Sequence, residues 1–188
     1  DEQLIAESTG KERKGVIPVA EEPLLDPSAY GNDRMFVYIR LDGDDNQVID
    51  TAVGNIKSAG QPVIQLSLAD RHDIGSEFFR WEFATAVIGS ILEINPFGQP
   101  DVDISKEETS KVLTEYETTG QLPEEVSSVK LTEILAGLVE GNYLAIMAFL
   151  SPTPEVESSF NRFRAAVMNK YRVATTLGFG PSFLHSTG

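Results

Sequence analysis

Cysteine is absent from the chain, and its 188 residues include only two histidines and one tryptophan. Without cysteine the chain forms neither a disulfide framework nor a thiolate metal site. The histidines, His72 and His185, are far apart in the sequence, so they do not predict a zinc site. No Gly-x-Gly-x-x-Gly pattern follows an expected strand and there is no P-loop, which argues against dinucleotide and nucleotide cofactors. We therefore expect neither a metal nor an organic cofactor.

Cations are also scarce, with 15 Lys and Arg against 29 Asp and Glu, a net charge of −14. Nucleic-acid binding needs a basic face, so this class of partner is not expected. The negative net charge does not exclude a local basic pocket that binds a phosphate. No apolar run reaches the roughly 20 residues that cross a bilayer, and no signal peptide is recognisable. These absences favour a cytoplasmic protein with no membrane partner.

Expected strands alternate with expected helices along the chain. The strands are expected at 16–19, 35–41, 63–68, 143–150 and 172–177, and the helices at 1–8, 48–56, 77–94, 106–116, 131–139 and from 154 onward. Such alternation predicts an α/β fold with a parallel sheet and helices on both faces. The helix at 77–94 is apolar on most sides, which is typical of a buried helix. The acids of residues 42–45 are expected to form a capping turn, because their spacing is not that of a calcium loop.

Residues 95–106, between two expected helices, read NPFGQPDVDISK. The stretch resembles Asn-x-Phe-Asp-Gln-Pro-x-Val-Glu-x-x-Lys, which is a hallmark of glucose-6-phosphate isomerases. The resemblance implies that Gln99 hydrogen-bonds the substrate phosphate or the surroundings of Lys106, and that Lys106 helps to open the sugar ring or holds the ring oxygen. Gly98 stands where the family has Asp. On the residues alone, Lys106 is a solvated lysine and Gln99 a turn amide.

Residues 7–11 read ESTGK and follow an expected helix. They resemble the Glu-Ser-x-Gly-Lys segment of the same family, whose Glu is the catalytic base. The resemblance implies that Glu7 moves a proton between C2 and C1 of the opened sugar through an enediol. Without the resemblance, the residues themselves indicate that Glu7 is a solvated side chain. Glu82, which follows Trp81 as in the family, is interpreted as a structural acid that pairs with a buried donor.

Residues 175–188 read TTLGFGPSFLHSTG. They are similar to a stretch found in the branch of the family whose isomerase is fused behind a transaldolase domain, although Ser182 stands where Arg is common. The resemblance makes His185 the candidate for the ring-opening histidine; the competing interpretation is a terminal residue without a role. His72, in a charged turn, is interpreted as a solvated residue.

Taken over nearly the whole chain, the resemblance implies a single sugar-isomerase (SIS) domain over residues 1–188, a three-layer α/β/α sandwich of Rossmann-like type cut from a longer chain. The implied reaction of glycolysis and gluconeogenesis interconverts glucose 6-phosphate and fructose 6-phosphate. The implied partners are the sugar phosphate, the N-terminal isomerase half and a transaldolase domain, and a homodimer is compatible. The fragment alone is expected to be nearly inactive. The alternatives are a non-catalytic sugar-phosphate-binding or regulatory SIS domain, or a scaffold that only completes a transaldolase.

Overall fold

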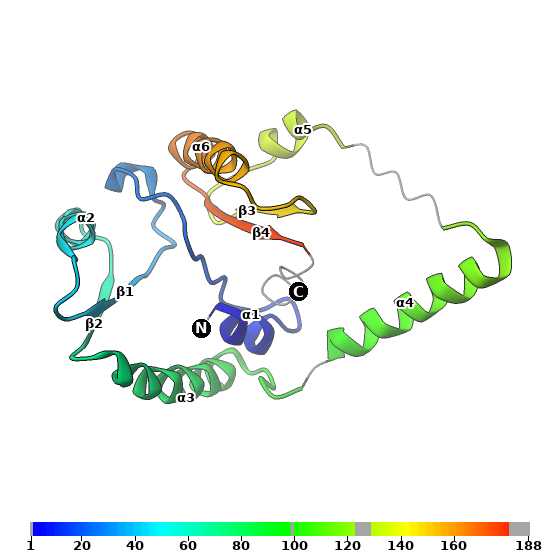
Figure 1. The fold of residues 1–188 in the computed structure, drawn as a ribbon, viewed down its shortest axis with the longest axis horizontal. Helices are drawn as coiled ribbons and strands as arrows, with labels where there is room; N and C mark the ends of the chain where they lie inside the picture. The colour runs from blue at the N-terminus through cyan, green and yellow to red at the C-terminus, as the bar shows by residue number, and fades with distance from the viewer. Residues whose placement is uncertain (1, 99, 123–128, 181–188) are drawn as a thin grey trace.

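Ten regular helices and strands follow one another in a computed structural model of the chain, which describes residues 2–98, 100–122 and 129–180 (Figure 1). Two short 3₁₀ turns, η1 (Pro27–Ala29) and η2 (Arg71–Asp73), lie between them. None of the described helices combines the length and the apolar character that a membrane crossing requires. In chain order the ten elements are α1 (Glu2–Thr9), β1 (Phe36–Leu41), α2 (Gln47–Ser58), β2 (Val63–Leu68), α3 (Ile74–Leu92), α4 (Pro100–Thr119), α5 (Leu131–Ala136), β3 (Tyr143–Ala148), α6 (Pro154–Tyr171) and β4 (Ala174–Phe179).

The four described strands form two parallel pairs, and the protein is therefore a mixed α/β structure. β1 pairs with β2, so that Phe36 lies opposite Val63, and β3 pairs with β4, so that Tyr143 lies opposite Ala174. In each pair the connection runs through a helix, α2 in one case and α6 in the other, as parallel strands require. The parallel pairing was predicted, whereas the described strands make two separate pairs rather than one sheet.

The strand predicted at 16–19 is wrong, because these residues have no strand partner in the described structure. The N–H of Val16 donates instead to the hydroxyl of Thr9 (3.0 Å). Pro18 has no N–H to offer to a neighbouring strand. The segment therefore runs as irregular backbone from the end of α1.

Helix α6 covers one face of the β3–β4 pair. Thr153 caps its first turn by accepting from the Val156 N–H (3.4 Å), and Pro154 follows at the first helical position. The Phe160 ring meets the Phe179 ring edge-on at 6.2 Å. Farther along α6, fully buried Met168 packs in one cluster with Tyr30 and Ile56, which brings α2 and the 19–35 segment to the same core.

A buried guanidinium joins α6, β4 and the 19–35 segment. Arg164 is 1% exposed, and it donates to the hydroxyl and carbonyl oxygens of Thr175 (3.1 and 2.9 Å) and to the Glu21 carbonyl (2.9 Å). Burial lowers the pKa of Arg164, and the nearby charges of Glu22 and Glu21 oppose that effect. Glu22 in turn accepts from the backbone N–H of Thr175 (2.7 Å), so a carboxylate occupies this edge of β4.

Helix α3 was predicted to be buried because of its apolar composition, and this is wrong for most of its apolar side chains. Along one face, four large apolar residues are between 42% and 74% exposed, namely Phe79, Phe83, Val87 and Ile91. The buried positions include Glu77, Thr85 and Gly89, and α3 also contacts α1. A hydrophobic side chain is buried only where another element covers it, and no described element covers this face of α3.

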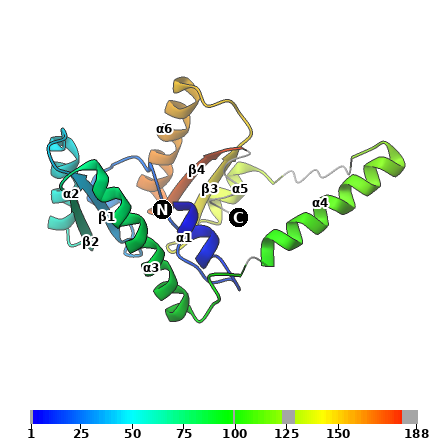
Figure 2. The same cartoon turned by 60° about the horizontal axis from the view of Figure 1, so that its bottom comes forward.

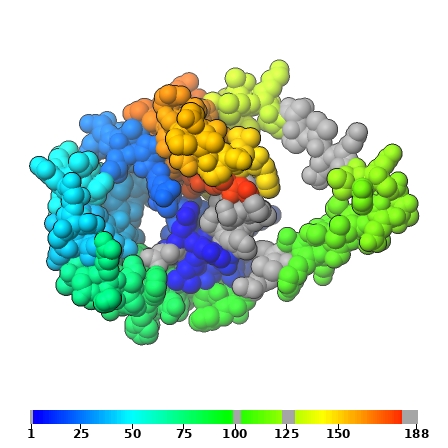
Figure 3. Space-filling model, in the orientation of Figure 1, coloured from blue at the N-terminus to red at the C-terminus, as the bar shows by residue number. Residues whose placement is uncertain are grey.

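Helix α4 stands apart from the rest of the described structure (Figures 1 and 2). Every described side chain from Asp103 to Thr119 is exposed, and in the space-filling view the green residues of α4 project outward from the molecule (Figure 3). Its last turns extend three residues beyond the predicted end at position 116. Hydrogen bonds within α4 join Thr109 to Ser105 and Lys111 to Glu108.

We predict that Arg164→Met lowers the free energy of unfolding by about 3 kcal/mol. The substitution keeps apolar bulk but leaves the buried oxygens of Thr175, and the Glu21 carbonyl, without their donor. Urea unfolding followed by the fluorescence of Trp81 measures the loss. Arg162→Met is the control on the same helix, where the guanidinium is exposed and, among the described residues, binds only Ser159. Equal losses in the two variants would contradict the structural role assigned to Arg164.

Candidate functional site

The last turn of α1 presents the carboxylate of Glu7 to solvent. One of its oxygens accepts from the Gln3 side chain, one turn earlier on the same helix (3.1 Å). The neighbouring residue, Ala6, faces a pocket instead. Glu7 is therefore accessible to a small molecule and held on a regular helix rather than on a loop.

The rest of the ESTGK segment ends α1 and fixes the chain that follows. The Lys11 side chain is buried, and its ammonium donates to the carbonyls of Glu7 and Ser8 in the last turn. A cation at this end also interacts favourably with the helix dipole. Buried Thr9 donates its hydroxyl hydrogen to the Ile5 carbonyl (2.7 Å) and accepts from Val16. These contacts give Thr9 and Lys11 a structural role.

A tight turn follows α1, and it exposes the side chains of two cations, Arg13 and Lys14. Lys11 and Lys14 pair across the turn, and both central residues, Glu12 and Arg13, have positive φ (56° and 61°). Such turns usually carry Asn or Gly at these positions, because a positive φ is sterically strained for most other residues. Gly15 has φ 154°, and a Cβ on it would lie 3.2 Å from the Gly10 Cα, so the two backbone segments touch.

A pocket of about 240 Å³ lies between this turn and the β3–β4 pair. Arg13 and Lys14 supply its charged wall, and Thr176 supplies a hydroxyl from β4. Thr176 is 5% exposed, and its hydroxyl oxygen has no hydrogen-bond partner in the described part of the chain. The apolar wall consists of Ala6, Val16, Ile17, Pro18 and Tyr143.

Thr176 points into this pocket because of the alternation along β4. The preceding Thr175 directs its hydroxyl to Arg164 on the α6 side. Successive strand residues face opposite sides, so Thr176 faces away from α6. Its partner in the parallel register is Ala145, two residues after Tyr143, and both therefore share this second face. The pocket thus lies on the face of the pair that α6 leaves open.

The other predicted site residues are not brought to Glu7 by the described structure. Lys106 lies on α4 with an exposed side chain, and α4 is remote from the β3–β4 pair (Figures 1 and 2). Gln99 and His185 lie outside the described residues. The roles implied for these three residues therefore remain predictions. His72, predicted to be a solvated turn residue, is exposed in η2.

The prediction that Glu82 pairs with a buried donor is wrong. Its side chain is exposed on α3. The buried acid of that helix is Glu77, one turn and one residue earlier, which is 3% exposed and lies 3.3 Å from the Arg80 guanidinium. The α-helical period places positions 77, 81 and 85 on one face, and 82 falls beside it.

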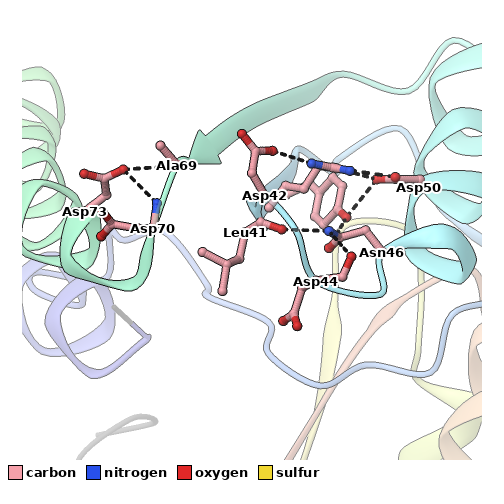
Figure 4. Close-up of polar contacts among 10 residues, drawn as sticks. Leu41, Asp42, Asp44, Asn46, Asp50, Ala69, Asp70 and Asp73 are labelled. Atoms are coloured by element: carbon pink, nitrogen blue, oxygen red, sulfur yellow. Dashed lines mark hydrogen bonds and ion pairs between the residues drawn. The ribbon is translucent and has the colours of Figure 1, made fainter.

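Acidic residues gather where β1 and β2 end, which is the edge that binds ligands in many open parallel sheets (Figure 4). In this protein several of these acids form ion pairs and hydrogen bonds with other residues of the chain. Arg40 pairs with Asp42 and with Asp50 (3.1 Å), and the Asn46 amide closes the turn by donating to the Leu41 carbonyl (2.7 Å). The 42–45 turn thus precedes α2 as predicted, although the residue at the cap position is Asn46.

After the second strand, Asp73 accepts from the backbone N–H groups of Ala69 and Asp70 (2.8 and 3.3 Å), and it forms a reciprocal cap of η2 with Asp70. Within the described ranges, no three His, Asp or Glu side chains are grouped closely enough to hold a metal ion. The acids of this edge would repel a phosphate, so the pocket beside α1 is the better candidate site for an anionic ligand.

The pocket residues were missed by the sequence reasoning. The run of cations between Gly10 and Gly15 was visible as a polar loop, and it was a usable signal for Arg13 and Lys14. Thr176 gave no signal, because its place depends on the register of β3 against β4 and on the position of α1.

No family model matches the chain, and no solved structure matches it.

We predict that Thr9→Val lowers the free energy of unfolding by about 2 kcal/mol. Valine has the shape of threonine but leaves the Val16 N–H without its acceptor and the Ile5 carbonyl without its donor. Urea unfolding is the measurement. Thr51→Val is the matched control, because the exposed Thr51 hydroxyl donates to the Gln47 carbonyl on its own helix. A loss no larger than that of the control would show that the Thr9 bridge is dispensable.

We predict that Asp50 stabilises the fold above the ordinary carboxyl pKa and ceases to do so in acid. Hydrogen bonds from Arg40 and then Tyr38 lower the pKa of Asp50. A carboxyl whose pKa is depressed by folding contributes stability above its unfolded pKa of about 3.9, and this contribution is lost as the pH falls through the folded pKa. The unfolding temperature of Asp50→Asn should be lower than that of wild type at pH 7, and the difference should close at about pH 2.

Asp45→Asn is the control for this pH dependence, since Asp45 is exposed in the same turn. A gap between wild type and Asp50→Asn that stays constant from neutral to acid pH would contradict the ion pair as its source.

Proposed function

We propose that this chain is part of an aldose–ketose isomerase that interconverts glucose 6-phosphate and fructose 6-phosphate, with Glu7 as the base. The observation that carries the proposal is the position of Glu7. It is an exposed carboxylate at the end of a helix, and residues 9–11 fasten that end to the chain that follows. Catalytic side chains need such fixed supports, because a small displacement of the catalytic group lowers the reaction rate.

The chemistry asks for one carboxylate that can take and return a proton. After ring opening, Glu7 removes the proton from C2 of glucose 6-phosphate, and the electrons of that bond form the C1–C2 double bond of a cis-enediol. The oxygen on C1 gains a proton while that on C2 loses one, and Glu7 returns its proton to C1. The product is fructose 6-phosphate. In this proposal Lys106 holds the ring oxygen, His185 assists ring opening and Gln99 binds the phosphate.

The proposal includes a finer fold and a larger assembly. We propose that the two parallel pairs belong to one three-layer α/β/α sandwich of SIS type, which the shared β–α–β connections support. We also propose that Lys106 meets Glu7 only in the presence of further polypeptide, an isomerase N-terminal half and a transaldolase domain, in the cytoplasm. The remoteness of α4 from α1 is consistent with this requirement (Figure 1).

We predict that Glu7→Gln reduces kcat for fructose 6-phosphate isomerisation by about 10³-fold in the longer polypeptide, because glutamine cannot accept the proton. Conversion to glucose 6-phosphate is measured under initial-rate conditions. Glu2→Gln is the matched control, since it removes the same charge from the first turn of α1. Turnover that survives in Glu7→Gln would exclude Glu7 as the base, and a wild-type protein without turnover would favour the non-catalytic sugar-phosphate-binding domain.

A further inference from the structure

The pocket beside α1 has the composition of an anion site in a chain that is otherwise strongly acidic. Its lining contains Arg13 and Lys14 and, among the described residues, no carboxylate. With 29 acids against 15 cations, a hollow lined by two cations and no acid is a departure from the bulk composition. Electrostatic attraction of an anion to such a site is local, because charges beyond about 10 Å are screened at moderate salt.

Both cations have hydrogen-bonding capacity left for a ligand. The Arg13 guanidinium is exposed and makes no hydrogen bond or ion pair to any described residue. Lys14 donates one hydrogen to the Leu92 carbonyl (2.7 Å), which ties the turn to the end of α3. An ammonium has three hydrogens, so two remain. A guanidinium offers a planar pair of donors that suits the oxygens of a phosphate.

Thr176 supplies the third polar group, and it is the one without a partner. A buried hydroxyl that makes no hydrogen bond is destabilising, and such groups are rare in folded proteins. The Thr176 hydroxyl is buried, lines the pocket and has no partner within the described ranges. An oxygen acceptor placed in the pocket would satisfy it. The hydroxyl therefore points to a ligand independently of the two cations.

The opposite wall determines what the anion is attached to. Val16, Ile17 and Pro18 follow the turn, and Tyr143 comes from the first position of β3. This wall offers carbon rather than charge. The volume of about 240 Å³ is close to the lower end of small-molecule sites and exceeds what one phosphate needs. The polar and apolar walls together suit a ligand with a phosphate at one end and a carbon body at the other.

From this arrangement we propose that the pocket formed by Arg13, Lys14 and Thr176 binds the phosphate group of a small phosphate monoester. Arg13 and Lys14 hold the phosphate oxygens, and the Thr176 hydroxyl donates to one of them. The carbon body of the ligand lies against Tyr143 and the residues that follow the turn. The inference does not require Glu7 to act as a base, because it rests on the lining of the pocket alone.

Calorimetric titration of the 188-residue chain with inorganic phosphate and with phenyl phosphate tests the inference. We expect one site per chain for both probes and tighter binding of phenyl phosphate, whose ring reaches the apolar wall. Arg13→Gln is expected to weaken binding of phenyl phosphate at least tenfold, because it removes charge-assisted hydrogen bonds. Thr176→Val, which preserves shape, is expected to weaken it about fivefold.

Arg71→Gln is the matched control, because it removes the same charge from an exposed residue of η2 and should leave binding unchanged. Lys14→Gln is avoided, since Lys14 also holds the end of α3. Circular dichroism establishes that each variant is folded. Wild-type protein that does not bind phenyl phosphate saturably would overturn the inference. Equal weakening in Arg13→Gln and Arg71→Gln would reduce it to a general ionic effect, and equal affinity for both probes would assign the pocket to the free anion.

Discussion

The hydrogen bonds of Arg164 are the constraint on which the described fold depends. One guanidinium reaches β4 and the 19–35 segment from α6, and the carboxylate of Glu22 completes the arrangement at the Thr175 N–H. The 19–35 segment also leads into β1 and contributes Tyr30 to the core shared with α2. The two parallel pairs are thus connected through a charged and hydrogen-bonded centre rather than through a continuous strand ladder. Such a centre is costly to disrupt, because each orphaned group would stay buried.

Local sequence signals were sufficient for most elements and insufficient for burial. Thr153 and Pro154 begin a helix by their own chemistry, and the β-branched run of β1 favours a strand in any context. Burial depends on what lies opposite. The apolar period of α3 was read correctly as a helix, yet Phe79, Phe83 and Ile91 are exposed in the described structure. The segment around Val16 shows that strand formation also depends on the surroundings, because the Val16 N–H donates to the hydroxyl of Thr9 and not to a neighbouring strand.

Of the candidate site, too, one part could be predicted from the sequence and another part could not. Glu7 was selected by resemblance to a short motif, and the structure gives that motif a structural content that the letters did not reveal: Thr9 and Lys11 end the helix and direct the next segment. The pocket beside it depends on three elements that meet only in the folded chain. A tight turn, one face of the β3–β4 pair and the last turn of α1 each contribute, and only the turn was readable as a cationic loop.

The use of cations explains why this pocket is distinctive. In a chain with about twice as many acids as cations, carboxylates would be expected to claim most of the positive charge. Several cations bind backbone carbonyls instead: Lys11 binds those of Glu7 and Ser8, Lys14 that of Leu92, and Arg172 that of Tyr30. A cation on a carbonyl keeps its net charge, whereas one on a carboxylate is neutralised. The turn at 11–14 therefore remains electropositive although the molecule is acidic, and Arg13 extends that positive charge to the pocket.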